Sequence, residues 1–224
     1  MMKKQSLVAA FLAGSFDLSS CGLDNAVKGA GIGAVGGAAI GAGIGRVLGN
    51  TALGTAIGGV LGGTAGTLIG RKMDKQKKEL EASVKDAKIE SVNDGQAIRV
   101  TFDSGILFAT SSASLSAASQ ATLRKFAANL AEHSDTDLLI VGHTDNTGSD
   151  RINNPLSYNR AASVRTFLLS QGVAETRMKV EGKGSTEPVA DNSTVAGRRD
   201  NRRVEVYILP SKDMVKAAEA GTLK

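Results

Sequence analysis

The sequence predicts an α+β fold for its second half, in which a single β-sheet carries helices on one face. Residues 97–102 and 204–208 alternate between apolar and polar side chains, which is typical of strands with one buried face. Residues 115–132 and 154–171 instead place their apolar side chains at helical spacing. A domain at 96–210 built from such segments can bury its apolar surfaces as one sheet packed against helices.

Local patterns predict the remaining elements of this domain. Ser114 or Ser116 can cap the first of the two helices. The apolar run 138–141 has the length and composition of a buried strand, and Gly172 is a typical stop for the second helix. Residues 177–182 predict a further short strand, which a polar loop connects to the last strand. The tail beyond the domain, 211–224, is expected to be a short helix or a frayed end.

The second predicted helix has one unusual residue. At about 100° per residue, Arg160 falls inside the same arc of the helix surface as Ala161, Val164 and Leu168. A guanidinium on an apolar face is costly unless an anionic group meets it. Asp145, at the end of the preceding strand, is the acidic candidate. Two interpretations are open: a structural ion pair or an arginine that reaches past the helix edge, or a site that receives a ligand with both an ammonium and a carboxylate.

The N-terminus predicts a lipoprotein signal peptide at residues 1–20. Lys3 and Lys4 form a charged start, an apolar stretch follows, and Cys21 is the only cysteine of the chain. This pattern resembles a bacterial lipoprotein signal, in which the cysteine is lipidated with chains such as palmitate and becomes the new N-terminus. Gly22 rather than an aspartate follows the cysteine, which by the same resemblance favours the outer membrane, with residues 21–28 as a lipidated tether.

Residues 29–70 repeat glycine at every fourth position, from Gly29 to Gly49 and again from Gly54 to Gly70. This spacing places the glycines along one helix face, as in the GxxxG packing of membrane helices. In water, such a series would cost on the order of 10 kcal/mol relative to alanine, so close packing, lipid or both must offset the loss. We expect a membrane-associated helical hairpin of the glycine-zipper kind; a flexible Gly/Ala linker is the alternative.

The segment 71–95 predicts a charged linker between this hairpin and the domain. Met73, Leu80 and Val84 form a loose helical stripe, and Arg71 with several lysines lies just beyond the glycines. These cations can bind anionic head groups of a membrane. A solvated helix face is an equally good interpretation of the same charges.

The composition argues against several classes of function. The formal net charge is +5, but tryptophan is absent and only 4% of residues are aromatic. Together with the lack of a zinc-finger or basic-helix pattern, this argues against nucleic-acid binding. Neither a metal-ligand spacing nor a cofactor motif occurs in the sequence. His143 and His133 lack an accompanying Ser or Cys nucleophile arrangement, so we do not expect an enzyme.

Four blocks occur in the order TFDSGILFAT, VGHTDNTGSDRINNPLSYNRAASV, GKGSTEPVADN and GRRDNRRVEVYI. In this order and spacing they resemble the OmpA-like C-terminal domain, a family that includes the peptidoglycan-associated lipoprotein and the C-terminal part of MotB. The resemblance covers residues 96–209 and implies a mixed β-sheet of the βαβαβ type. With the lipoprotein signal and the glycine segment in front, the layout resembles the YiaD-type lipoproteins of this family.

The resemblance implies non-covalent binding of peptidoglycan through the diaminopimelate residue of its stem peptide. By matching motif, Asp145 and Arg160 would hold that residue, because diaminopimelate carries an ammonium and a carboxylate on one carbon. The residues of the same blocks that would add hydrogen bonds or reach another carboxylate are Thr144, Asn146, Asn153 and Arg202.

The predicted function is therefore that of an outer-membrane lipoprotein whose periplasmic domain tethers the envelope to the cell wall. Many weak contacts along a polymer would give firm attachment. The alternative is a membrane assembly protein, in which the glycine helices form a homo-oligomer and wall binding only positions it. A wall hydrolase is a third class, but the sequence supplies no catalytic group for it.

Overall fold

The computed structural model describes residues 61–109 and 111–223, so the predicted signal peptide, Cys21 and most of the glycine segment lie outside the described residues. The first elements in chain order are α3 (Gly63–Ser83), β1 (Lys88–Val92), β2 (Ala97–Asp103), α4 (Ser104–Leu107) and α5 (Ala117–Glu132). They are followed by β3 (Thr136–Gly142), α6 (Asp150–Ser170), the 3-10 helix η1 (Glu175–Arg177), β4 (Met178–Gly182), α7 (Val195–Asn201), β5 (Arg203–Pro210) and α8 (Lys212–Glu219).

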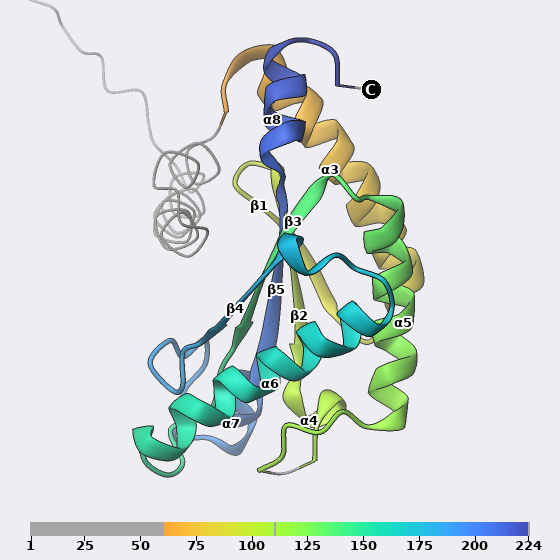
Figure 1. Cartoon of the computed structure of the whole chain (residues 1–224). Coiled ribbons are helices and arrows are strands. Elements are labelled where there is room, and N and C mark those ends of the chain that lie inside the picture. Colours follow the sequence, from red (N-terminus) through yellow and green to blue (C-terminus); the bar gives the residue numbers. More distant parts are fainter. Residues whose placement is uncertain (1–60, 110, 224) are drawn as a thin grey trace, which may run out of the picture.

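The five strands form one mixed sheet in the order β1-β2-β5-β3-β4 (Figure 1). β3 and β4 are parallel, and α6 connects them, as a crossover between parallel strands requires. The other neighbouring strands are antiparallel. The last strand of the domain, β5, therefore lies in the middle of the sheet, where all eight of its residues are buried.

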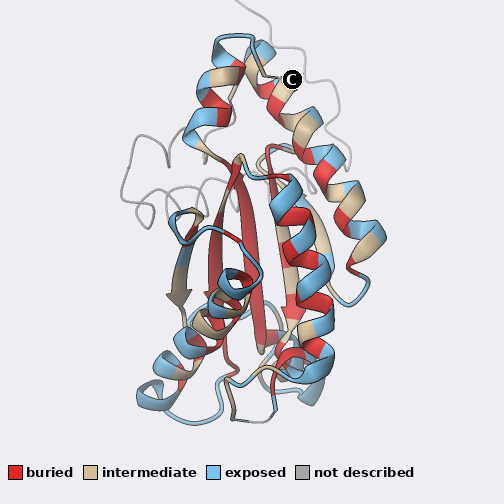
Figure 2. Cartoon of the chain, turned by 45° about the vertical axis from the view of Figure 1, so that its right-hand side comes forward, coloured by how far each residue is buried: buried red, intermediate tan, exposed pale blue. Residues whose placement is uncertain are grey.

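The helices α3, α5 and α6 cover one face of this sheet, and the main core lies between them (Figure 2). Strand residues that point to this face alternate along the sequence, as the period of two predicts. Phe102 of β2 meets Phe126 of α5 edge to face, with ring centroids 5.6 Å apart. The predicted fold class, a mixed sheet with helices on one face, is confirmed.

The segment predicted as a linker is part of this folded body. α3 continues without a break from the last glycines of the repeat to Ser83, and β1 pairs with β2 at the edge of the sheet. The stripe seen in the sequence is buried, and Gln76, which interrupts it, is buried too because its amide donates a 3.0 Å hydrogen bond to Asn129 of α5. Within the described residues, no helix is long and apolar enough to cross a membrane.

The helix cap and helix stop predicted from the sequence are found in the structure, which also contains the short helices α7 and α8. Ser116 caps α5 by accepting a hydrogen bond from the backbone nitrogen of Ser119, and Gly172 follows α6 with a φ of +91°. The tail contains α8, whose apolar side packs against α3. Within the loop that precedes β5, Thr194 caps the additional helix α7.

Candidate functional site

Two glycines bring α6 unusually close to the ends of β3 and β4. Gly142 and Gly182 are partners in the parallel register of these strands. A Cβ atom at Gly142 would collide with the carbonyl oxygen of Ser157, and one at Gly182 would lie 2.5 Å from the backbone nitrogen of Tyr158. The Ser157 hydroxyl also accepts a 2.9 Å hydrogen bond from the backbone nitrogen of Gly184. The first turns of α6 are thereby held beside the loop that follows β3.

Asp145 lies in that loop and is 7% exposed. Its Oδ1 accepts a 2.9 Å hydrogen bond from the backbone nitrogen of Thr147, and its Oδ2 accepts a 2.6 Å bond from Nη1 of Arg202. Burial opposes the ionisation of Asp145, but the contacts with Arg202 and Thr147 outweigh it, so the pKa of this carboxyl lies below its ordinary value. Asp145 is therefore a fixed negative charge near the end of β3.

Asn153, in the first turns of α6, holds the shape of the loop. Its Nδ2 donates hydrogen bonds of 3.3 Å and 3.2 Å to the carbonyl oxygens of Asp145 and Thr147. The side chain is buried, so these bonds have little competition from water. Asn153 therefore holds Asp145 in position, and its amide nitrogen already donates to two carbonyl oxygens of the loop.

Arg160 is buried within the core-facing side of α6, as the helical arc predicts, and is only 4% exposed. Its Nε donates a 3.0 Å hydrogen bond to the carbonyl oxygen of Ser112, and its guanidinium lies 5.4 Å from the ring centroid of Phe108. Burial and the nearby charge of Arg202 lower the pKa of Arg160, while Asp145 opposes that shift.

The predicted pairing of Asp145 with Arg160 is not the pairing that the structure contains. The ion pair of Asp145 is made with Arg202, and no carboxylate of the described residues forms an ion pair with Arg160. The reason is geometric, since Arg160 is directed toward the segment after α4, whereas Arg202 comes from the end of α7. Asp145 still lies close enough to Arg160 to raise the pKa of its guanidinium, against the larger effects of burial and Arg202.

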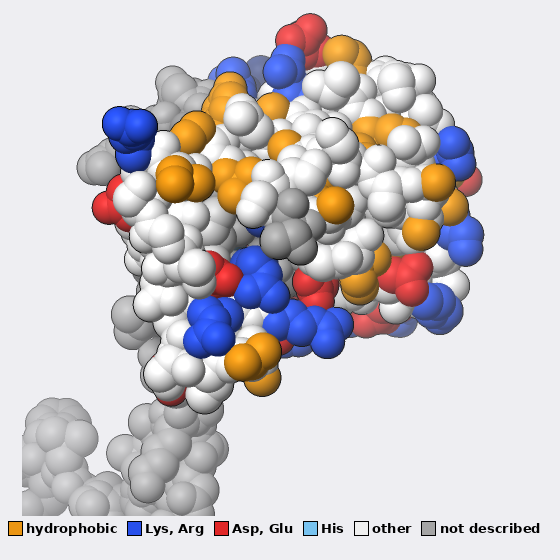
Figure 3. Space-filling view, turned by 90° about the horizontal axis from the view of Figure 1, so that it is seen from below, with side chains coloured by type: hydrophobic (Ala, Val, Ile, Leu, Met, Phe, Trp, Pro, Cys, Tyr) orange, Lys and Arg blue, Asp and Glu red, His pale blue; other side chains and the backbone are white. Residues whose placement is uncertain are grey.

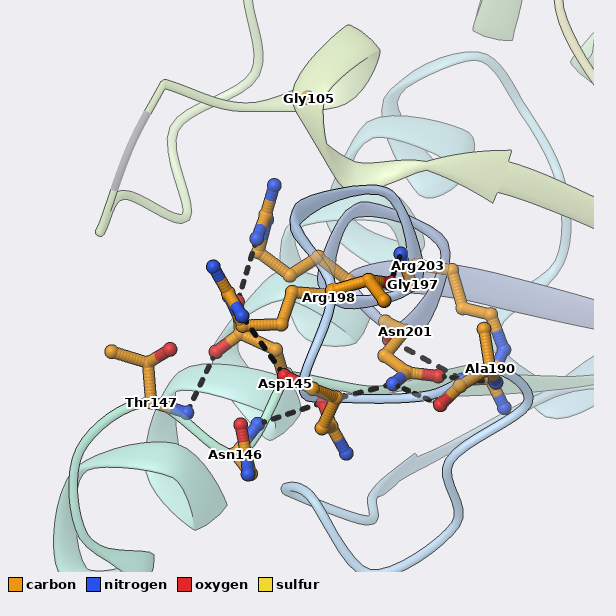
Figure 4. A network of polar contacts seen from close by, with 12 residues as sticks. Gly105, Asp145, Asn146, Thr147, Ala190, Gly197, Arg198, Asn201 and Arg203 are labelled. Atoms are coloured by element: carbon orange, nitrogen blue, oxygen red, sulfur yellow. Dashed lines mark hydrogen bonds and ion pairs between the residues drawn. The ribbon is translucent and has the colours of Figure 1, made fainter.

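Amides connect the Asp145 loop to α7 (Figure 4). Asn201 accepts hydrogen bonds from the backbone nitrogens of Val189 and Ala190, and its Nδ2 donates a 2.9 Å bond to Oδ1 of Asn192. Asn192 in turn accepts a 3.3 Å bond from the backbone nitrogen of Asn146. This network fixes the position of the chain around Arg202. Figure 3 views the molecule from below, the end at which α7 lies in Figure 1, and shows Lys and Arg side chains gathered beside acidic ones.

Four of the predicted site residues therefore gather at one end of the sheet: Asp145, Asn153, Arg160 and Arg202. Thr144 is buried beside them, and its hydroxyl has no hydrogen-bond partner among the described residues. Asn146 is exposed and joins the network through its backbone. Sequence reasoning missed Ser112, Phe108, Asn192 and Asn201, because their contributions depend on contacts between distant segments.

A second cluster of charges lies behind the site, around β5. Arg203 donates a 2.7 Å hydrogen bond to Oε1 of Glu205, and the Tyr207 hydroxyl donates a 2.6 Å bond to its Oε2. Burial opposes the ionisation of Glu205, but contacts with His143, Arg203 and Tyr207 outweigh it and lower its pKa. His143 is buried with its Nε2 3.7 Å from Glu205. The described residues contain no group of three acidic, histidine or cysteine side chains placed to hold a metal.

Comparisons with known proteins agree with this architecture. The OmpA family model matches residues 107–202, and a glycine zipper model matches residues 25–77. "Probable lipoprotein YiaD" of Escherichia coli K12 is 35% identical over 63% of this chain and 65% of its own length. "Peptidoglycan-binding protein ArfA" of Mycobacterium tuberculosis H37Rv is 41% identical over 50% of this chain and 34% of its own. The match thus spans from about a third to just under two thirds of these relatives.

A solved structure extends the comparison over a whole domain. The cell wall anchor of the T6SS from Pseudomonas aeruginosa is 33% identical to this chain, with a TM-score of 0.54. The match covers 61% of this chain and 97% of the anchor. Sequence blocks, sheet order and these relatives lead to the same assignment: the chain belongs to the OmpA family.

Proposed function

We propose that this protein binds the stem peptide of peptidoglycan through a diaminopimelate residue, whose carboxylate meets Arg160. The observation that carries the proposal is the state of the Arg160 guanidinium. It is buried, one of its nitrogens donates to a carbonyl oxygen, and the described residues offer it no carboxylate. A buried cation without an anionic partner is costly, and a ligand carboxylate would relieve that cost through bidentate hydrogen bonds.

The ammonium group on the same carbon of diaminopimelate would lie against Asp145. This carboxylate is held ionised, and Asn153 and Thr147 fix its loop. Arg202, whose side chain is 38% exposed, can move from Asp145 to a carboxylate elsewhere on the peptide when the ammonium arrives. Thr144 and Asn146 border this position and would add hydrogen bonds. The exchange replaces the Asp145–Arg202 ion pair by three pairs with the ligand, at Asp145, Arg160 and Arg202, which favours the zwitterionic ligand.

The names of relatives support the same ligand class. ArfA is named as a peptidoglycan-binding protein, and the Pseudomonas structure is named as a cell wall anchor. The direction of the domain suits such a role: the described chain begins beside α8, at the end of the sheet opposite to α7 and the start of β5 (Figure 1). A membrane attachment before residue 61 would therefore leave the Asp145 loop facing away from the membrane.

The complete function that follows is a tether between the envelope and the wall. Cys21 would carry the lipid in the outer membrane, the glycine segment would associate with that membrane, and the OmpA domain would bind the wall in the periplasm. Non-covalent binding at many points along the polymer would make the attachment firm although each contact is weak. The protein would act by binding alone, without a cofactor and without catalysis.

Calorimetric titration of the full chain tests the site. The free stem tripeptide with diaminopimelate should bind, and the matched tripeptide with lysine should bind at least tenfold more weakly because it lacks the second zwitterionic centre. Asp145→Ala and Arg160→Ala should each abolish most of the heat of binding. Arg165→Ala, on the same helix and paired with Glu175 at the surface, is the control. Unchanged binding in both site variants would refute the assignment.

A second candidate function rests on the glycine zipper match at residues 25–77. In it, the zipper assembles copies of the chain in the membrane and the domain positions the assembly at the wall. Chemical cross-linking in membranes distinguishes the two functions. Assembly predicts a ladder of oligomers that disappears when Gly37 and Gly41 are changed to leucine; a cross-linking pattern unaffected by these changes would leave tethering by single chains.

A further inference from the structure

A groove of about 630 Å³ lies between α5 and α6, next to Arg160 but outside the charged site. The described residues that line it include none with a charge, although 22% of the chain is charged. Its polar groups are hydroxyls and amides, from Ser114, Gln120, Asn159, Ser163, Thr166 and Ser170. Leu115 and Phe167 add apolar surface. Neutral hydrogen-bonding groups beside an apolar patch suit an uncharged ligand with many hydroxyl and amide groups.

The groove adjoins the proposed peptide site. Asn159 lies in the groove, and Arg160 is the next residue of α6. The segment after α4 forms the shared wall: the carbonyl oxygen of Ser112 accepts the hydrogen bond of Arg160, while Leu115 faces the groove. Leu115 is in turn bridged to Phe108, the ring that lies under the Arg160 guanidinium.

Several groove side chains are free to bind. Among the described contacts, no hydrogen bond occupies the side chains of Gln120, Asn159 and Thr166, and Thr166 is exposed. Ser163 and Ser170 donate to carbonyl oxygens of their own helix, and the Ser170 oxygen also accepts a 3.1 Å bond from Gln171, so Ser163 is the one of the two whose oxygen has no donor among the described contacts. The groove therefore offers donors and acceptors along one side of α6.

We infer that this groove binds the glycan strand to which the stem peptide is attached, an inference that rests on the proposed function. The alternating N-acetylated sugars carry hydroxyl and amide groups, and the lactyl carboxyl of the muramic acid loses its charge when it is joined to the peptide. Diaminopimelate is the third residue of the stem, and its free ammonium and carboxylate lie at the end of its side chain. This side chain and two residues, which alone span about 7 Å, therefore separate the bound group from the sugar. The groove begins at Asn159, beside Arg160, and ends at Ser170, about 15 Å along the helix from Arg160, so a sugar at that separation would lie along the groove.

The test compares two ligands on the full chain: the free stem tripeptide and the same tripeptide attached to its N-acetylglucosamine–N-acetylmuramic acid disaccharide. Calorimetry should show the disaccharide-peptide binding about three- to tenfold more tightly to the wild type. Gln120→Ala and Thr166→Val should reduce that advantage and leave affinity for the free tripeptide unchanged. Thr67→Val, the same change at an exposed position of α3, is the matched control.

The outcomes separate the two proposals. Equal affinity of the wild type for both ligands, or an equal loss of both in the groove variants, would overturn the glycan groove and leave the peptide site intact. If neither ligand binds the wild type, the proposed function fails and the groove inference fails with it. Thr166→Arg provides a second check, because a bulky cation in the groove should remove the advantage of the disaccharide while the free tripeptide still binds.

Discussion

Arg202 and Arg203 are neighbours at the start of β5, yet they belong to regions with opposite character. Arg203 is 4% exposed and lies in a closed cluster, in which Glu205 accepts hydrogen bonds from both Arg203 and Tyr207. Arg202 lies at the surface and bonds to Asp145, beside Arg160, which has no carboxylate partner among the described residues. In the closed cluster the carboxylate of Glu205 already has a guanidinium and a hydroxyl as partners, whereas in the open site the guanidinium of Arg160 has no carboxylate. The candidate site is therefore distinguished by a buried cation that has no carboxylate partner among the described residues.

The largest effect is expected where the closed cluster is broken. Glu205→Ala leaves the buried Arg203 and Tyr207 without their shared partner, and the free energy of unfolding should fall by about 3–5 kcal/mol in urea denaturation. Glu187→Ala, which removes an exposed partner of Lys183, should change it by less than about 0.5 kcal/mol. A loss as small as that of the control would show that the cluster contributes little to folding.

The open site should respond in the opposite way. Arg160→Met removes a buried cation that lacks a carboxylate, so the free energy of unfolding should stay unchanged or rise. Affinity for the diaminopimelate tripeptide should fall by about 2–3 kcal/mol, roughly 30- to 150-fold. Calorimetry and urea denaturation of the same preparation measure both quantities. Destabilisation comparable to that of Glu205→Ala would make Arg160 a structural residue like Arg203.

The close approach of α6 to the sheet affects both the stability of the fold and the candidate site, because Arg160 lies on that helix. Gly142→Ala would force Ser157 away from β3 and should lower the free energy of unfolding by about 1–3 kcal/mol, with a weaker affinity for the tripeptide. Gly70→Ala is the matched control, since nothing lies within 4 Å of the new Cβ atom and α3 should gain up to about 1 kcal/mol. If Gly142→Ala changes neither the free energy of unfolding nor the affinity, then α6 can shift away from β3 without cost.

The smallest effect concerns pH. Because folding lowers the pKa of Asp145, its ion pair with Arg202 stabilises the fold fully above about pH 4 and is lost as the pH falls through the lowered pKa. Arg202 is partly exposed, so the contribution is expected to be about 0.2–1 kcal/mol. Wild type and Asp145→Asn should differ by that amount at pH 6 and converge toward pH 2. A difference that persists at low pH would assign it to a cause other than charge.

Much of the fold could be predicted from the sequence because its signals are local. Alternation and helical spacing depend on residues within a few positions of each other, and they identify β2, β3, β5, α5 and α6. The same periodicity places Arg160 on the buried side of its helix. The sequence does not show the full extent of α3, because Gln76 interrupts its apolar stripe. The buried partner of Gln76, Asn129, is 53 residues away. A segment whose apolar stripe is interrupted by a polar residue resembles a linker until the buried partner of that residue is known.

The candidate site, too, could be predicted only in its local features. The sequence by itself determined which residues carry charge near the end of β3, and it determined that one guanidinium must be buried, because helix geometry is a short-range property. Only the tertiary structure decided that Asp145 pairs with Arg202, 57 residues along the chain, and that Arg160 meets a carbonyl oxygen and an aromatic ring. Such pairings depend on how the sheet brings distant loops together, and no local pattern records that arrangement.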